Sequence, residues 1–396
     1  PHNAVRIVLN RTPGHGRYVE AAKELKAWLA AGVLRRDGER CFYVHRETFD
    51  VPSTGSPIRA SRIGLLAAVR LEPWSAGAVK PHEHTMPGPK QDRLSLMRAT
   101  QADTEPIWVF HPDPNRDLLA ALEAIAAEPP NLAATFRPVP NLEGDEHVES
   151  HELWRVSHPA TVARLATAAS SAQLYIADGH HRYETALHHA GEVGGGPNDA
   201  TGFKLMLLSA VEDPGLLVLP THRLVKLPEG RSLGEFLGAL QSWGWTSEQP
   251  AGFGDLVARL RRPSPPRMLG FGLVAERRYT YLEGPIPVAG VAALAPSIAA
   301  LDVGLLHQGV LEPLLGIGAE QLNAGELISY SRDALEVKER VALGEYDLGI
   351  LTRAPSLAQV QAVADAGQNM PQKSTYFWPK PASGLVMLLQ PPGEVL

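Results

Sequence analysis

The order of apolar and polar positions predicts a chain that mixes helices and strands from its beginning. Residues 19–29 carry apolar side chains at helical spacing, which predicts an amphipathic helix. Residues 41–44 and 63–71 are short apolar runs typical of strands. A polar stretch at residues 80–93, which contains prolines and a glycine, then leads into a predicted helix at residues 94–99.

The middle of the chain continues this mixture. Residues 128–150 are rich in proline, asparagine and acidic residues, which predicts a surface hairpin with a long loop. Three glycines at residues 194–196 mark the end of a predicted helix. The other elements expected here are strands at 107–110, 174–177, 203–210 and 216–219 and helices at 118–127, 161–169 and 183–192.

A shift in composition near residue 226 predicts two domains. The segment Lys226-Leu-Pro-Glu-Gly230 is the best candidate for a linker, and 396 residues exceed the usual length of one domain. We therefore expect a first domain at residues 1–226 and a second at 227–396, each of the α+β class. The second is predicted to contain helices at 233–243, 253–260, 303–314 and 357–366 and strands at 268–274, 279–282, 348–352 and 384–389.

Composition excludes several classes of protein. Apolar residues make up 44% and charged residues 20% of the chain, as in ordinary globular proteins. The formal charge is 37 minus 43, or −6, so neither nucleic acid nor an acidic membrane surface is an expected partner. Cys41 is the sole cysteine, which excludes an intrachain disulfide, and no run approaches the roughly 18 apolar residues of a membrane span. We expect a cytoplasmic protein.

The most informative chemistry lies where a predicted strand meets a predicted helix. Asp178 and Gly179 end the strand, and His180, His181 and Arg182 occupy the turn before the helix. A helix start presents unpaired N–H groups and the positive end of its dipole, and glycine lets a phosphate approach the backbone closely. Arg182 adds a planar charged fork for phosphate oxygens, and the imidazoles can donate hydrogen bonds. The turn therefore predicts a phosphate site.

Asp178 has two possible roles at this turn. Its carboxylate can cap the helix, or it can bind a Mg²⁺ ion that bridges phosphates. The structural alternative for the whole turn is that Asp178 is only a cap and the two histidines are only polar surface residues.

A second polar cluster precedes the helix predicted at residues 94–99. Glu83 lies between two histidines and is a candidate general base, because a carboxylate can take the proton of an attacking hydroxyl. Lys90 and Arg93 can neutralise phosphate charge, and His82 and Thr85 are candidate substrate contacts. The alternative is a solvated loop.

The same histidines leave a metal site open. His82 and His84 are two residues apart, a spacing that places both on one face of a strand. Together with His180, His181 and Asp178 they could hold zinc or iron in a metal-dependent hydrolase. The neighbouring prolines favour a loop over a strand, and no His-Glu-x-x-His motif supports this alternative.

Weaker candidates lie farther along the chain. His222 and Arg223 follow a predicted strand and can complete the phosphate pocket. Lys373, Ser374, Thr375 and Lys380 form a basic, hydroxyl-rich turn beside three aromatic residues, suited either to phosphate or substrate contact or to packing. His307 lies in an apolar helix and is predicted to be a buried core or interface residue. The sequence contains neither a P-loop nor a G-x-G-x-x-G turn nor a G-x-S-x-G elbow.

Four motifs of the sequence are distinctive in combination: Pro81-His-Glu-x-Thr85 with Gly88-Pro-Lys90, Tyr175-Ile-Ala-Asp-Gly-His-His-Arg-Tyr-Glu184, Leu219-Pro-Thr-His-Arg223 and Lys373-Ser-Thr-Tyr-Phe377. Together they resemble the prokaryotic family known as domain of unknown function 1015. The likeness runs nearly end to end. Members usually carry a further N-terminal stretch with a Pro-Pro-Tyr-Asp-like motif, which this sequence does not contain.

The turn from Asp178 to Arg182 also resembles the phosphate-binding motif of the ParB and sulfiredoxin superfamily, which includes free-serine kinases. This resemblance implies a ParB-like mixed α/β nucleotide-binding domain at residues 1–226 and phosphoryl transfer from ATP or ADP to free L-serine. It also implies that Glu83 is the base, matched by its order along the chain, and that the turn residues, His180 and His181 among them, hold the phosphates.

The leading hypothesis is therefore a cytoplasmic small-molecule kinase that uses ATP or ADP and Mg²⁺. A non-enzymatic, nucleotide-dependent switch is the alternative from another class, because other ParB relatives use this turn to bind nucleotide and change partners. A metal-dependent hydrolase with histidine ligands is the third hypothesis.

Overall fold

The computed structural model describes most of the chain. The described residues are 2–52, 58–83, 85, 87–136, 148–170, 172–194, 198–265, 268–286, 291–292, 294–371 and 373–396, apart from the side chains of 87–89, 319 and 323. Within them the chain forms two compact units: Pro1–Asp50, Arg59–Leu216 and Pro379–Leu396 make up unit 1, and Val51–Ile58 and Leu217–Trp378 make up unit 2. The boundary expected after residue 226 stays a prediction about domains.

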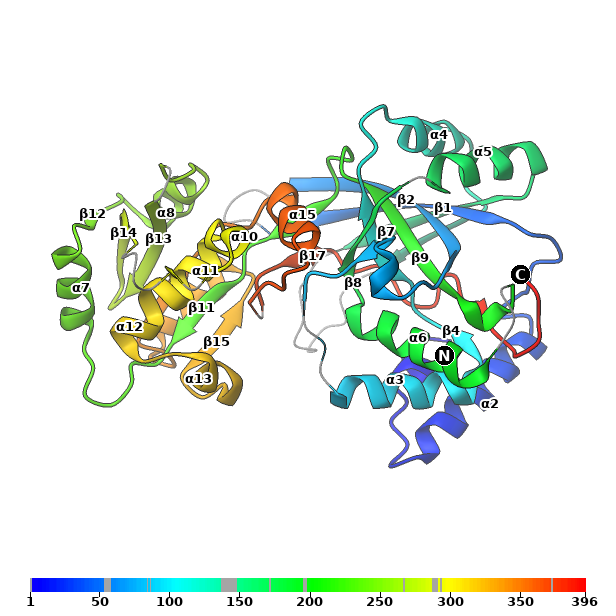
Figure 1. Cartoon of the computed structure of the whole chain (residues 1–396), viewed down its shortest axis with the longest axis horizontal. Coiled ribbons are helices and arrows are strands. Elements are labelled where there is room, and N and C mark those ends of the chain that lie inside the picture. Colours follow the sequence, from blue (N-terminus) through cyan, green and yellow to red (C-terminus); the bar gives the residue numbers. More distant parts are fainter. Residues whose placement is uncertain are drawn as a thin grey trace. The chain divides into compact units, whose positions relative to one another are not determined.

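Unit 1 is built on a mixed sheet whose strands come from distant parts of the sequence (Figure 1). β3 pairs with β8 and β5 pairs with β9 in parallel, whereas β5 with β8, β2 with β9, β1 with β7 and β7 with β6 are antiparallel. Across the described sheet the order is β3 (Val79–Lys80), β8 (Leu174–Asp178), β5 (Ile107–His111), β9 (Phe203–Ala210), β2 (Ile58–Arg70), β1 (Phe42–Val51), β7 (Glu149–Val156) and β6 (Leu132–Phe136).

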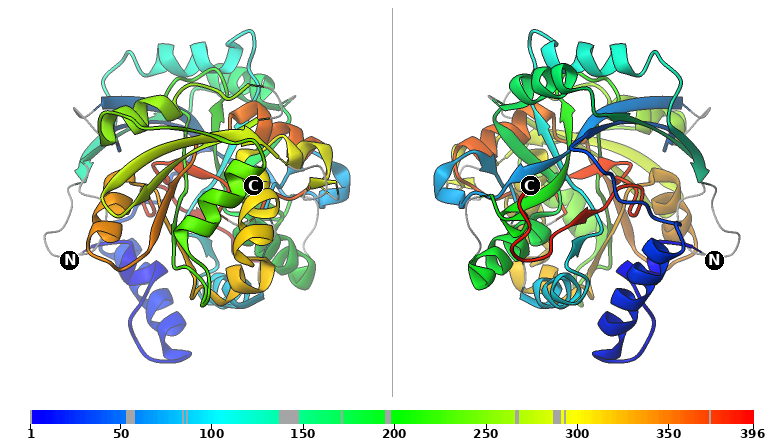
Figure 2. Two further views of the ribbon diagram at one scale, coloured as in Figure 1. Left: turned by 90° about the vertical axis from the view of Figure 1, so that its left-hand side faces the viewer. Right: turned by 90° about the vertical axis from the view of Figure 1, so that its right-hand side faces the viewer.

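Helices cover both faces of this sheet. Figures 1 and 2 show α4 (Asp117–Ile125) and α5 (Pro159–Ser170) together on one side of the long strands. On the other side, α3 (Pro87–Thr100) packs against both α2 (Gly16–Ala30) and α6 (His180–Val193). Because both faces are covered, β5 is buried along its whole length, as its continuous apolar sequence predicts.

The remaining elements of unit 1 are short. Pro379–Leu396 returns to the unit from the end of the chain, and its strand β18 (Leu388–Leu389) pairs with β4 (Ala102–Asp103). The other elements are α1 (Val5–Val8), η1 (Trp74–Ala76) and η2 (Ala200–Gly202).

Unit 2 has an antiparallel sheet of its own. Ser232 and Glu235 form a capping box that fixes the start of α7 (Leu233–Ser242), and Ser356 and Gln359 do the same for α15 (Leu357–Asp365). The described strand order is β12 (Thr246–Glu248), β14 (Arg278–Pro285), β13 (Met268–Ala275), β16 (Leu348–Leu351), β11 (His222–Val225) and β15 (Ile328–Ser331). A separate pair joins β10 (Leu217–Leu219) to β17 (Tyr376–Trp378). The other helices are α8 (Phe253–Leu260), α10 (Pro296–Ala299), α11 (Asp302–Leu306), η3 (His307–Leu311), α12 (Glu312–Leu315), α13 (Ala319–Ala324) and α14 (Ala334–Ala342).

The α+β class predicted from the sequence is confirmed, and β6 and β7 of the predicted hairpin pair in an antiparallel register, while its predicted loop at 137–147 lies outside the described residues. His307 is buried, as predicted, although the helix around it includes a five-residue π-helical stretch. Among the described residues, we find no helix that combines the length and the apolar character needed to cross a membrane. The ParB/sulfiredoxin-like assignment of the first domain stays a prediction.

Candidate functional site

A strand, a tight turn and a helix follow one another from β8 to α6 as predicted, but the helix begins three residues earlier, so His180, His181 and Arg182 form its first turn and do not precede it. β8 ends at Asp178, Gly179 has φ +108°, and α6 begins at His180. A Cβ atom at Gly179 would lie 3.1 Å from Nε of Arg182 and 3.2 Å from Cγ1 of Ile107. Only glycine fits both the positive φ and this close packing. We call Asp178–Arg182, together with the side chains that contact it, the β8–α6 corner.

Two cations hold the Asp178 carboxylate. Arg182 donates to Oδ2 at 2.5 Å, and Lys380 donates to Oδ1 at 2.6 Å. Burial alone would raise the pKa of Asp178, but Arg182 and Lys380 together hold this pKa below its usual value. Arg182 also donates to the backbone carbonyl of Pro106 at 2.7 Å. Asp178 does not cap α6, because the N-cap residue is Gly179, where no side-chain cap is formed.

The two buried histidines of the corner are held in one orientation. Nε2 of His180 accepts a hydrogen bond from the backbone N–H of His82 at 3.2 Å, and the two rings meet edge to face at 4.7 Å. Burial lowers the pKa of His180 well below its usual value and lowers the pKa of His82 to about 4, so both rings are neutral at pH 7. A neutral His180 that accepts at Nε2 carries its proton on Nδ1.

Glu83 reaches the same corner. Its Oε2 atom lies 3.9 Å from Nδ1 of His180, and its side chain is 35% exposed. The carboxylate is therefore accessible to a ligand and lies close to the proton-bearing nitrogen of the buried histidine. His82, in contrast, is fully buried, so it supports His180 and is not exposed to a substrate.

A network of polar side chains joins the start of α3 to the first turns of α6. Lys90 donates to Oε2 of Glu184 at 2.8 Å and to the hydroxyl of Thr85 at 3.1 Å. Thr85 donates to the same oxygen of Glu184 at 2.6 Å. Burial raises the pKa of Glu184, but the hydrogen bonds from Lys90 and Thr85 bring this pKa below its usual value. Burial lowers the pKa of His181, and the positive charge of Lys90 lowers it further.

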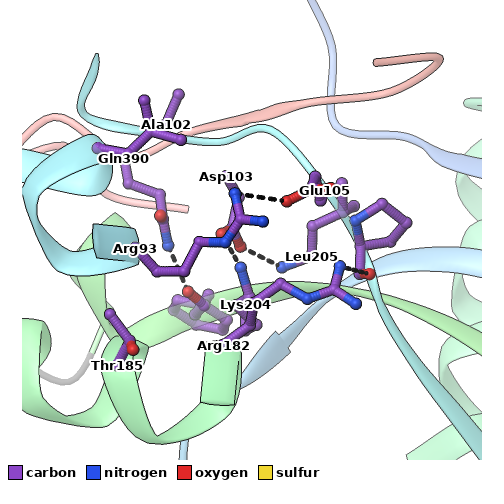
Figure 3. Close-up of polar contacts among 12 residues, drawn as sticks. Arg93, Ala102, Asp103, Glu105, Arg182, Thr185, Lys204, Leu205 and Gln390 are labelled. Carbon is purple, nitrogen blue, oxygen red and sulfur yellow. Dashed lines mark hydrogen bonds and ion pairs between the residues drawn. The ribbon is translucent and has the colours of Figure 1, made fainter. Parts of the chain in front are cut away.

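Arg93 faces a separate, small cavity. It forms an ion pair with Glu105 at 3.3 Å, and Lys204 beside it is bonded to Asp103 (Figure 3). Burial lowers the pKa of Lys204 to about 7. The cavity, which Arg182 also lines, measures about 30 Å³. This volume accommodates about one water molecule and is far below the volume of about 300 Å³ at which ligand pockets begin.

Four of the predicted site residues belong to unit 2. Nδ1 of His222 accepts the backbone N–H of Thr352 at 3.1 Å, and burial lowers its pKa to about 3. Arg223 is buried and donates to His307 at 3.1 Å. Lys373 has φ +56°, and Ser374 donates to the carbonyl of Pro371 at 2.5 Å. Their assignment to the phosphate and substrate sites stays a prediction.

The structure brings together most of the remaining predicted residues. His82, Glu83, Thr85, Lys90 and the turn Asp178–Arg182 share one corner of unit 1. His84, the second ligand of the hypothetical metal site, lies outside the described residues. Nε2 of His180 is engaged by a backbone N–H, which makes this atom unsuitable as a metal ligand.

Two further residues of the corner are Glu184, for which the sequence predicted no role, and Lys380, which it placed in the basic turn near the C-terminus as a phosphate or substrate contact. Glu184 belongs to the quoted motif, and its position one turn after His180 and His181 was a signal that could have indicated it. Lys380 lies 202 residues after its partner Asp178, and no local pattern links the two.

The corner combines positive charge with the start of a helix. Gly179, the N-cap residue of α6, forms no side-chain cap. The side chains of Lys90 and Lys380 are 35% and 36% exposed, so an incoming anion can reach them. A phosphate group can accept from the backbone amides at this helix start and from these lysines.

Comparison with known families gives one clear match. Residues 1–304 match the family described as "Protein of unknown function (DUF1015)". No curated protein matches the sequence.

Solved structures give only distant similarity. A free serine kinase in complex with AMP is 13% identical, with 79% of this chain and 86% of that chain covered and a TM-score of 0.37. SbnI with a C-terminal truncation, from Staphylococcus aureus, is 14% identical over 83% of this chain and 87% of that chain, with a TM-score of 0.37. A conserved hypothetical protein from Pyrococcus furiosus is 13% identical over 79% of this chain and 90% of that chain, with a TM-score of 0.35. Likeness at this level carries no argument about activity.

Proposed function

This chain belongs to DUF1015, a family of proteins of unknown function, so its activity has to be argued from its own residues, and we propose that it is a small-molecule phosphotransferase. The phosphoryl donor is ATP or ADP, and the acceptor is the hydroxyl of a small molecule, with free L-serine as the leading candidate. The β8–α6 corner supports this proposal, because the start of α6, two lysines that are about one third exposed and the carboxylate of Glu83 meet there.

Each group has a role that its position supports. Phosphate oxygens accept from the first-turn amides of α6, and Lys90 and Lys380 neutralise their charge. Arg182 already donates to Asp178 and to the carbonyl of Pro106, so its proposed role is to hold the corner in shape and not to bind the phosphate directly. Phosphoryl transfer requires chiefly positioning and charge neutralisation, which this set can supply.

Glu83 is the proposed base. Its carboxylate takes the proton of the acceptor hydroxyl, the hydroxyl oxygen bonds to the terminal phosphorus, and the bond from phosphorus to the bridging oxygen breaks as the nucleotide leaves. Nδ1–H of His180 lies 3.9 Å from this carboxylate. His82 positions this imidazole through its backbone N–H and does not contact substrate.

Mg²⁺ does not fit the position predicted for it. Both oxygens of Asp178 are engaged, one by Arg182 and one by Lys380. A metal ion there would have to displace one of these pairs and would lie next to the remaining cation. We therefore derive no step through a metal at Asp178, and this carboxylate is a positioning residue that holds two cations at the corner.

L-serine is proposed as the acceptor because the turn from Asp178 to Arg182 resembles that of free-serine kinases. The test is incubation of the full chain with ATP or ADP and L-serine, followed by ³¹P NMR and mass spectrometry for O-phosphoserine. Glu83→Gln should reduce turnover by about 10²- to 10⁴-fold, the usual contribution of a general base, with nucleotide affinity unchanged. Glu229→Gln, at an exposed glutamate of unit 2, is the matched control and should retain full turnover.

The outcomes separate the alternatives. Nucleotide binding without phosphoserine from either nucleotide would exclude the serine kinase. If Glu83→Gln also left every nucleotide-dependent property unchanged, a nucleotide-dependent switch would be the better description. Calorimetry of Lys380→Met should show weaker nucleotide binding, whereas Lys26→Met, at an exposed lysine of α2, should not. If the two variants bound nucleotide with equal affinity, the β8–α6 corner would not be the nucleotide-binding site.

A further inference from the structure

A second group of buried ionisable side chains lies on β1 and β7, separated from β8 by three strands of the same sheet. In the antiparallel register, Glu47 lies opposite His151, and Phe49 lies opposite Glu149. Residues directly opposite each other share a face of the sheet, and alternate residues along a strand do too. Glu47, Glu149 and His151 therefore project from one face, and we call these three the β1–β7 cluster.

The three side chains are close enough to bind one ion. Nε2 of His151 lies 3.4 Å from Oε2 of Glu149, and Nδ1 of the same ring lies 3.8 Å from Oε1 of Glu47. One donor atom from each residue can be chosen so that all three lie within 4.8 Å of one another. Donors about 2.1 Å from a tetrahedral ion are roughly 3.4 Å apart, the separation that Nε2 of His151 and Oε2 of Glu149 already have, and donors 4.8 Å apart would close by about 1.4 Å on binding.

Two atoms of the cluster are buried without a hydrogen bond. Glu47 and His151 are both fully buried. Within the described residues, neither Oε1 of Glu47 nor Nε2 of His151 has a hydrogen-bond partner. Buried polar atoms are nearly always bonded, so an orphaned acceptor on each of two facing residues indicates a missing partner. A cation that accepts a lone pair from both atoms provides one.

The surroundings hold these atoms in place. The other oxygen of Glu47 is bonded to Arg62, which also donates to the carbonyl of Pro379 at 3.1 Å. Nδ1 of His151 lies 3.1 Å from Nε2 of His45, close enough to share a proton. When Nδ1 carries that proton, Nε2 of His151 presents its lone pair toward Glu149. Such outer hydrogen bonds orient the ligands of natural metal sites.

We propose that Glu47, Glu149 and His151 bind one divalent transition-metal ion, with Zn²⁺ as the best match. One imidazole nitrogen and two carboxylate oxygens are ligands that zinc accepts, and they leave a fourth position for water. The ion links β1 to β7. The site is independent of the proposed kinase activity, because none of its ligands belongs to the β8–α6 corner.

The test uses the full chain after EDTA treatment and dialysis. Isothermal titration with ZnCl₂ should give one site per chain, and CoCl₂ should give the visible absorption of a tetrahedral ion. Glu149→Gln, at the most exposed of the three ligands, should weaken Zn²⁺ affinity by at least about 100-fold, since loss of even an outer partner costs 10- to 100-fold. Zn²⁺ should raise the melting temperature of the native chain but not that of Glu149→Gln.

The matched control is Glu152→Gln. Glu152 lies on β7 too, but it belongs to the other face of the sheet and pairs with Arg46. The Glu152→Gln variant should bind Zn²⁺ with the same affinity as the native chain. His151→Asn should abolish binding, and Glu149→Gln keeps the test valid if the histidine variant does not fold. Absence of stoichiometric Zn²⁺ binding by folded chain, or equal loss in Glu149→Gln and Glu152→Gln, would overturn the site. The site would also be overturned if His82→Asn, at the β8–α6 corner, lost Zn²⁺ binding while the variants of the β1–β7 cluster kept it.

Discussion

The β8–α6 corner and the β1–β7 cluster are both polar groups within unit 1, yet they balance their charges in different ways. At the corner, both oxygens of Asp178 are engaged by cations, and Lys90 and Lys380 are about one third exposed. In the cluster, Arg62 engages one oxygen of Glu47, while the other is buried and, within the described part of the chain, without a hydrogen bond.

The difference indicates what each region requires. At the corner the Asp178 carboxylate is already neutralised by cations, and the partly exposed lysines can exchange a carboxylate partner for a phosphate at little cost, because water screens the exchange. The cluster is desolvated, so an unsatisfied charge there is expensive. The β8–α6 corner therefore suits a substrate that binds and leaves, whereas the β1–β7 cluster suits a ligand that stays bound.

The largest effect is expected from the arginine of the buried region. Arg62→Met leaves Glu47 buried without its cation and should lower the free energy of unfolding by about 3–5 kcal/mol. Arg182→Met at the corner should cost only about 1 kcal/mol, because Lys380 and water remain available to Asp178. Urea unfolding in EDTA, followed by the fluorescence of the tryptophans, measures both; Trp108 lies beneath Arg62, 3.7 Å from its guanidinium.

A double variant sharpens this comparison. Glu47→Leu combined with Arg62→Met removes both charges of the buried pair and should recover most of the lost stability, since apolar replacements of buried pairs are often neutral. Equal costs for Arg62→Met and Arg182→Met would show that burial does not distinguish the two regions.

An intermediate effect is expected from the glycine of the corner. Gly179→Ala forces an alanine to adopt φ +108° and places its Cβ against Arg182 and Ile107, which should cost about 1–3 kcal/mol. Gly191→Ala on the same helix meets open space and should instead stabilise by about 0.5–1 kcal/mol. Thermal unfolding of both variants checks this opposition. A neutral Gly179→Ala would mean that the turn relaxes without strain.

The last effect appears only as the pH changes, and it concerns the neutral histidine beneath the corner. Burial lowers the pKa of His82 to about 4, from about 6.5 in the unfolded chain. Only the unfolded state therefore binds this proton between these pH values, and stability is full above pH 6.5 and is lost as pH falls toward 4. The contribution should be about 2 kcal/mol between pH 7 and pH 5.

His82→Asn cannot bind the proton, so its free energy of unfolding should fall less steeply below pH 6.5. The groups that face His82 are the ring of His180, Asp178, Lys380 and the backbone of Ile176, and all of them stay in place. His158→Asn, at an exposed histidine, is the control. The measurement is the urea unfolding midpoint at pH 7, 6 and 5. If the midpoints of the native chain and His82→Asn fell in parallel with pH, His82 would not be a buried, neutral histidine.

Local patterns predicted the corner well. Gly179 after an apolar strand and before a helical pattern indicated the turn, and the structure has that turn with a positive φ. The apolar run at residues 203–210 predicted β9 with the same bounds. These features depend on neighbours in sequence, so a window of a few residues contains the cause.

Local patterns failed where polar side chains face inward. The strand predicted at residues 41–44 extends to Val51 as β1, because His45 and Glu47 are buried and so give the strand no apolar alternation. α3 begins at Pro87, seven residues before the predicted helix, in a stretch whose polar sequence suggested a loop. Periodicity assumes that buried positions are apolar, and both segments break that assumption.

The sequence by itself determined the α+β class, the strand-turn-helix of the corner and the donors and acceptors within it. Tertiary structure alone decided that Lys380 meets Asp178 across 202 residues and that Glu47 faces His151 on a neighbouring strand. The physical reason is that backbone conformation responds to residues a few positions away, whereas ion pairs and ligand sets depend on which strands become neighbours. That order is set by packing of the whole core, which no short segment encodes.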